Sequence, residues 1–189
     1  MKTRTALFLA VLASVLVIAL GVTRYGWTLA GLQATTRFSG RLSLAVFTAI
    51  FILYPKQETR LKNLLSPGFF LVFAVVHGIH LIELLTYVYK SQIPLVPTRV
   101  AGGFLAYALI FVMPYLQVMT NQGRLAAEKF ARVGYVYLFY VWFVFFMTYL
   151  ARVRGTFPNA GGTYAEHAAL TGVVIGILLW KVIQLVRNK

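Results

Sequence analysis

Six apolar segments, separated by short polar connections, dominate the hydrophobic pattern of this chain. They are Ala6–Val22, Leu42–Tyr54, Phe69–Tyr89, Val100–Met119, Val133–Ala151 and Ala168–Val186. The third segment has 21 residues, and about 20 helical residues cross the hydrocarbon core of a bilayer. The pattern therefore predicts an all-α fold: a polytopic membrane protein, built as a bundle of six transmembrane helices in a single transmembrane domain over residues 1–189.

Three of the segments have unusual lengths or charges. The second has only 13 residues, and it spans a bilayer only if the preceding turn is added and Arg41 extends its side chain to the headgroups. Lys181, near the end of the sixth segment, can do the same. The first segment is longer than the apolar core of a signal peptide, so we expect it to stay as the first span. With these six segments as spans, Tyr25–Gly40 is one of the longest connections.

Composition supports the membrane interpretation. The chain of 189 residues is 60% hydrophobic and only 12% charged, against about 25% charged residues in soluble proteins. So few charges could not cover a water-soluble fold of this size. The absence of cysteine excludes disulfides and thiolate ligands.

The net charge of +14 comes from cations that stand singly or in small groups beside the apolar segments. This distribution is typical of membrane flanks that attract anionic lipid headgroups, and it argues against nucleic-acid binding. Eleven Lys and Arg residues flank the segments on the side of the termini and seven flank them on the other side. The positive-inside rule then places both termini in the cytoplasm. We expect a multi-pass protein of the prokaryotic inner (plasma) membrane.

Four polar residues interrupt the third segment: His77, His80, Glu83 and Tyr87. Spacings of three and four place them on one face of a helix. An ionised side chain at this depth costs about 3 kcal/mol, and ionisable groups inside a membrane usually mark a functional site. The alternative is structural: neutral histidines and a protonated Glu83 bond to one another and to neighbouring carbonyl groups.

Three kinds of chemistry fit this face. A b-type haem would take His77 or His80 as one axial ligand, and His167 or Met147 from another helix as the opposing one, because two ligands from one helix cannot face each other across an iron. Two histidines and a glutamate also form a donor set for non-haem zinc or iron. Finally, a buried carboxyl group beside histidine can relay protons, with Glu83 and Tyr87 as carriers.

Three stretches of the sequence resemble the ferric reductase-like transmembrane domain family, which includes the haem membrane subunit of the methionine-sulfoxide reductase system. They are Thr36–Leu44 (TRFSGRLSL), Gly68–His80, and Met119–Arg124 followed by Phe130–Tyr137. The resemblance covers roughly Thr35–Ala151. It implies haem b held by histidines of the third and fifth helices, and electron transfer across the membrane. The fifth segment here has no histidine; Gly134 and Met147 stand about where the family carries them.

From these observations we expect a b-type haem protein for transmembrane electron transfer, with His77 or His80 opposed by His167 or Met147. The chain has no nucleotide-binding fingerprint and no catalytic domain of its own. It would therefore act as the membrane subunit of an oxidoreductase, with a redox partner or reductase at the cytoplasmic face. The alternative is a haem-free transporter, proton-relay or structural protein that uses the face formed by His77, His80 and Glu83 for an ion or for packing.

Overall fold

The computed structural model describes residues 3–54, 68–94, 96–156 and 161–187. Within these ranges the chain forms six helices and no strand. The helices are α1 (Thr3–Tyr25), α2 (Leu29–Leu53), α4 (Phe69–Lys90), α5 (Pro97–Asn121), α6 (Ala127–Val153) and α7 (Tyr164–Arg187). Each is long and apolar enough to cross a membrane. The predicted all-α fold is thus confirmed for the described residues, as are six helices long and apolar enough to span a membrane.

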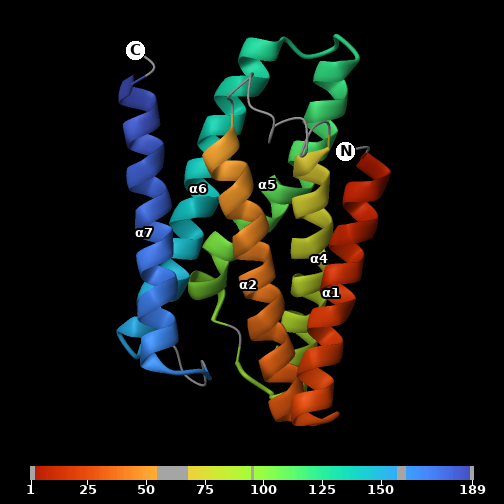
Figure 1. Ribbon diagram of the computed structural model, residues 1–189, viewed down its shortest axis with the longest axis vertical. Helices are drawn as coiled ribbons and strands as arrows, with labels where there is room; N and C mark the ends of the chain where they lie inside the picture. Colours follow the sequence, from red (N-terminus) through yellow and green to blue (C-terminus); the bar gives the residue numbers. More distant parts are fainter. Residues whose placement is uncertain (1–2, 55–67, 95, 157–160, 188–189) are drawn as a thin grey trace.

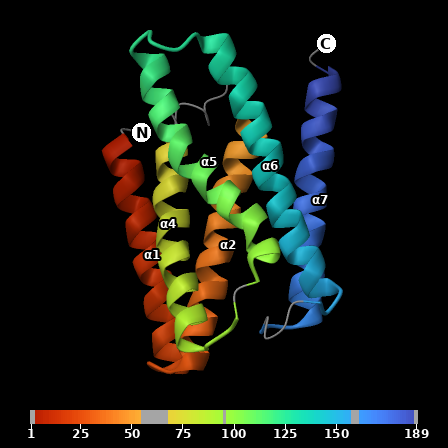
Figure 2. The same cartoon turned by 180° about the vertical axis from the view of Figure 1, so that it is seen from behind.

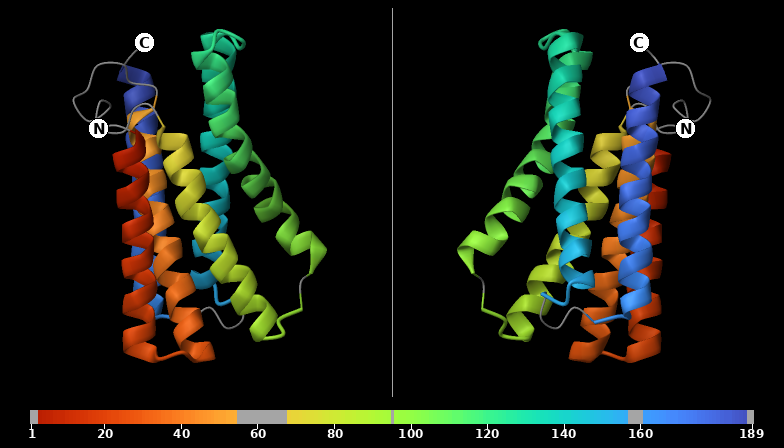
Figure 3. Two further views of the ribbon diagram at one scale, coloured as in Figure 1. Left: turned by 90° about the vertical axis from the view of Figure 1, so that its right-hand side faces the viewer. Right: turned by 90° about the vertical axis from the view of Figure 1, so that its left-hand side faces the viewer.

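Successive helices run in opposite directions, so the start of α1 and the end of α7 lie at the same end of the bundle (Figure 1). We call this the termini end and the other the opposite end. Helix α2 packs against α1, α4 and α7, and seen from behind, α5 crosses obliquely over the bundle (Figure 2). Side views show that α5 meets α6 at the termini end and leans away from the bundle toward its first residues (Figure 3).

Helix α2 is the main departure from the predicted spans. It begins at Leu29 and has 25 residues, so most of the expected connection Tyr25–Gly40 is helical. Thr28 caps the helix by accepting a hydrogen bond from the Gly31 N–H at 3.1 Å, as N-cap residues do. The polar residues of the first half of α2 lowered the apparent hydrophobicity of the segment, although several of them face other helices. The other five helices extend past the predicted segments by no more than six residues at either end.

An aromatic core fills the centre of the bundle. The Phe47 ring of α2 lies 5.6 Å from that of Phe73 on α4 and 5.2 Å from that of Phe145 on α6. Near the termini end, Tyr54 packs directly over Gly134, where an added Cβ would lie 2.7 Å from the tyrosine Cζ. Gly134 therefore makes room for the aromatic ring of Tyr54.

The two cations expected to reach the lipid headgroups are held by the protein instead. Lys181 is only 1% exposed, and its ammonium group donates to the carbonyl oxygen of Tyr54, the residue that ends α2. Arg41 forms an ion pair with Glu166 in the first turn of α7, at 3.1 Å. Both cations thus tie the two helices together, because each contact joins α7 to α2 or to the residue that follows α2.

Candidate functional site

The polar face of α4 packs against α2, which supplies a polar face of its own. His80 lies over Gly40, where an added Cβ would be 3.1 Å from the imidazole Cε1. The lack of a side chain at Gly40 lets the imidazole approach the α2 backbone. Close packing of these two helices therefore brings residues of α2 within hydrogen-bonding distance of the ionisable groups on α4.

Ser39 of α2 is the centre of this contact. Its hydroxyl oxygen lies 2.5 Å from Glu83 Oε2 and 2.9 Å from His80 Nδ1, and it also reaches the Thr36 carbonyl at 3.1 Å. A hydroxyl group has one hydrogen to donate and can accept from other donors. When Ser39 donates to the Glu83 carboxylate, it can accept a hydrogen bond from the Nδ1–H of His80. When Glu83 is protonated, both bonds can reverse direction.

Toward the opposite end, the polar face continues to Tyr87. The side-chain amide of Gln33 on α2 donates to the Tyr87 hydroxyl at 3.1 Å. Tyr87 and Gln33 are both half-buried. The face thus runs from the half-buried pair Tyr87 and Gln33 to the buried carboxyl group of Glu83.

Toward the centre of the bundle, His77 has an aromatic environment. Its ring stacks on Phe73 at 5.1 Å and on Tyr107 of α5 at 4.7 Å, and lies 5.4 Å from the ring of His80. His77 and Glu83 are each 8% exposed. His77 Nδ1 and Glu83 Oε1 have no hydrogen-bond partner, which is unusual for buried polar atoms. Both atoms are open to a proton or a ligand.

His167 lies in a second polar group, where α7 begins. Its Nε2 pairs with the Gly161 carbonyl at 2.9 Å, and its Nδ1 is buried without a partner. Thr163 and Glu166 form a capping box there: Glu166 accepts from the Thr163 N–H at 3.0 Å, and Thr163 accepts from the Glu166 N–H at 3.2 Å. The Thr-x-x-Glu spacing is a known start signal for helices.

The structure places the four predicted haem ligands on three helices: His77 and His80 on α4, Met147 on α6 and His167 on α7. His77 and His80 stand one turn apart on the same helix, and one nitrogen of His167 already pairs with a backbone carbonyl. Met147 is 46% exposed, on the surface of α6 rather than across from a buried imidazole. Among the residues that the structure describes, no three His, Asp or Glu side chains are placed to share a metal ion.

Sequence reasoning identified the polar face of α4 but missed the residue that joins it. Ser39 lies in the stretch TRFSGRLSL, which carries part of the family resemblance and the start of a predicted span, without giving Ser39 a role. The available signal was the alignment of Thr36, Ser39 and Ser43 at helical spacing.

No family model, curated protein or solved structure matches this chain.

Proposed function

We propose that this protein carries protons within the membrane, along a relay formed by Glu83, Ser39 and His80. The observation that supports it is the position of the Ser39 hydroxyl, within hydrogen-bonding distance of a buried carboxyl group and of an imidazole at once. Ionisable groups inside a membrane are costly, and chains of Asp, Glu and His are typical of proton pathways. The proposal corresponds to the haem-free alternative rather than to electron transfer.

The transfer step needs only groups that are present. A protonated Glu83 gives its proton to Ser39 Oγ, while the Ser39 hydroxyl gives its own hydrogen to His80 Nδ1. Glu83 becomes a carboxylate and His80 becomes an imidazolium, so charge and protons balance. His80 then releases a proton from Nε2, and rotation of the serine hydroxyl together with exchange of the ring tautomer resets the chain.

The relay connects the opposite end of the bundle to its centre. Tyr87 and Gln33 stand at its entrance and His77, with an unpartnered Nδ1, lies next to its inner end. Beyond His77, the aromatic core around Phe47 and Phe145 separates it from the termini end. A proton that reaches His77 therefore needs a rearrangement of this core to continue, which favours coupled or gated transfer over an open channel.

Proton movement across vesicles that contain the purified protein tests this function. A pH gradient is imposed, potassium and valinomycin clamp the voltage, and a trapped pH dye reports uptake. The Glu83→Gln variant removes the titratable oxygen and should reduce uptake to that of empty vesicles. Glu128→Gln is the matched control, because Glu128 is exposed in the first turn of α6 and its loss should leave uptake unchanged.

An absorption spectrum separates this function from electron transfer. After expression with ample haem, a colourless preparation that still takes up protons supports the relay. A Soret band that shifts on reduction, and that disappears on replacement of His77 or His80 by alanine, would instead support the haem protein expected from the resemblance.

A further inference from the structure

Three arginines gather beside α7 at the opposite end of the bundle, where the charge of Arg152 also acts on His80 of the relay. Arg37 and Arg41 come from α2, and their charges act on Arg152, which lies in the last turn of α6 and donates to the Thr148 carbonyl at 3.2 Å. Glu166 is the carboxylate that the structure shows paired in this group. Three guanidinium groups and one carboxylate give these four described side chains a formal net charge of +2.

Arg37 carries a buried donor in this cluster. Its Nε is buried and forms no hydrogen bond with the residues that the structure describes. Its Nη1 lies against the two glycines that precede α7: a Cβ added at Gly161 would be 3.2 Å away, and one at Gly162 would be 2.9 Å away. Gly162 has a φ of +83°, so glycine suits this position both by conformation and by space. A buried guanidinium N–H without an acceptor is unfavourable, since such donors are nearly always satisfied.

The arginines also lie deep along α2. At 1.5 Å per residue, Arg37 and Arg41 stand about 12 and 18 Å from the first residue of the helix. They reach the level of α7 because α1 and α2 extend further at this end than α6 and α7 do (Figure 1). Like charges so close together repel one another, and more strongly where water is partly excluded. An anion bound among them would offset this repulsion.

We propose that Arg37, Arg41 and Arg152 bind a phosphate group, with Arg37 Nε as one of the donors. Arginine forks pair with oxoanions in a bidentate manner. A phosphate monoester carries about −1.5 to −2 charges at neutral pH, which matches the excess of the cluster. This inference concerns residues that are not carriers in the proton relay, and its test measures binding rather than proton flux.

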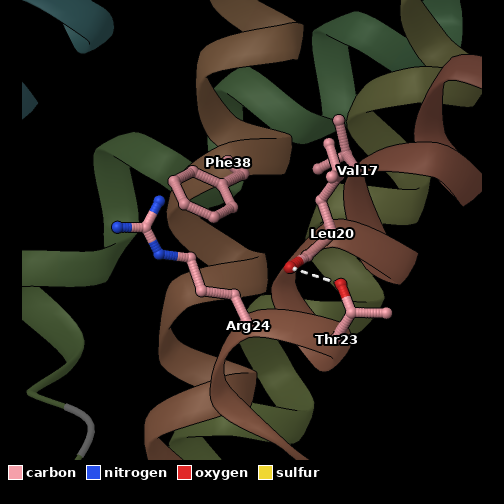
Figure 4. Close-up of a pocket in the computed structure, with 5 residues that line it drawn as sticks. All are labelled: Val17, Leu20, Thr23, Arg24 and Phe38. Atoms are coloured by element: carbon pink, nitrogen blue, oxygen red, sulfur yellow. Dashed lines mark hydrogen bonds between the residues drawn. The ribbon is translucent and has the colours of Figure 1, made fainter.

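The phosphate group can come from the solution or from a lipid. Next to the cluster, a pocket of about 360 Å³ opens between α1 and α2, lined by Val17, Leu20, Thr23, Arg24 and Phe38 (Figure 4). The Arg41 guanidinium lies over the Phe38 ring at 5.4 Å. The same phenylalanine thus borders the pocket and the arginine cluster, so an anionic lipid could place a chain in the pocket and its phosphate among the arginines.

Calorimetric titration of the detergent-purified protein with inorganic phosphate, at constant ionic strength, tests the site. Wild type should bind one phosphate saturably, and Arg37→Gln should raise the Kd at least tenfold. Arg124→Gln is the matched control, since Arg124 is exposed in the turn between α5 and α6 and its loss changes the net charge equally. Absence of saturable binding, or equal Kd values for wild type and Arg37→Gln, would overturn the proposal.

A second variant acts in the opposite direction. Glu166→Gln removes the carboxylate from the cluster, while glutamine can still complete the capping box. It should lower the Kd for phosphate about threefold or more, because Arg41 loses its competing partner. A purely structural arginine cluster predicts no tightening, so an unchanged or raised Kd would also overturn the proposal.

Measurements in nanodiscs distinguish a lipid phosphate from free phosphate as the group that occupies the site. If a lipid headgroup is the natural occupant, phosphatidic acid, whose phosphate is a monoester, should compete and raise the apparent Kd for inorganic phosphate relative to discs of phosphatidylcholine alone. Equal Kd values in the two kinds of disc would assign the site to free phosphate.

Discussion

Replacing Ser39 by alanine should destabilise the fold, because it removes the hydroxyl that joins two helices and two ionisable groups. The lost contacts are those to Glu83 at 2.5 Å and to His80 at 2.9 Å. A hydrogen bond to a charged group contributes about 1.5–3 kcal/mol and an ordinary one about 0.5–1.5 kcal/mol. The expected loss in the free energy of unfolding is therefore about 2–4 kcal/mol.

Ser43 offers a matched control one helical turn further along α2. It is as buried as Ser39, at 0% and 2% exposed respectively, but its hydroxyl has no hydrogen-bond partner. Ser43→Ala should therefore be neutral or stabilising, since it removes an unsatisfied polar group. Unfolding by sodium dodecyl sulfate in mixed micelles, followed by helical circular dichroism, measures both variants. Equal losses for Ser39→Ala and Ser43→Ala would refute this reasoning.

Three further predictions follow from the packing. Gly134→Ala should lower the free energy of unfolding by about 1–3 kcal/mol, because the added methyl group overpacks against Tyr54. Gly103→Ala, where an added Cβ would have no atom within 4 Å, should raise the free energy of thermal unfolding by up to about 1 kcal/mol. A larger loss for Gly103→Ala than for Gly134→Ala would contradict the packing. His77→Phe should raise the free energy of unfolding by about 1 kcal/mol, because it removes an unpartnered nitrogen from the core. The same variant should reduce proton uptake by vesicles. Unchanged uptake would show that His77 is not part of the proton pathway. Arg41→Gln should cost less than about 1 kcal/mol, since Arg41 and Glu166 are 29% and 42% exposed; a loss above 2 kcal/mol would contradict that expectation.

The hydrophobic pattern predicted the number of helices well, because five of the six apolar segments, all except Leu42–Tyr54, are close to the length needed to cross a bilayer. It failed at α2, where Gln33, Thr36 and Ser39 face α4 or their own backbone. Hydropathy scores such residues as exposed, although their polar groups are satisfied inside the protein. The start of α2 was instead encoded by the cap at Thr28.

The candidate site was predictable on one helix and not across two. Spacing alone placed His77, His80 and Glu83 on one face of α4. It could not show that a serine of α2 links two of them, because that depends on how α2 and α4 pack. Likewise, the positions of Arg37 and Lys181 inside the bundle follow from tertiary contacts, whereas their charges favoured the membrane surface.

Proton uptake by vesicles containing the Ser39→Ala variant tests the central claim most directly. The two hydrogen bonds at Ser39 span at most 5.4 Å, the sum of 2.5 and 2.9 Å, and without the hydroxyl the carboxyl group and the imidazole need not lie within hydrogen-bonding distance of each other. Uptake should fall about tenfold or more, which corresponds to roughly 1.4 kcal/mol in the barrier, while Ser43→Ala should behave as wild type. Equal uptake by Ser39→Ala, Ser43→Ala and wild type would contradict the relay.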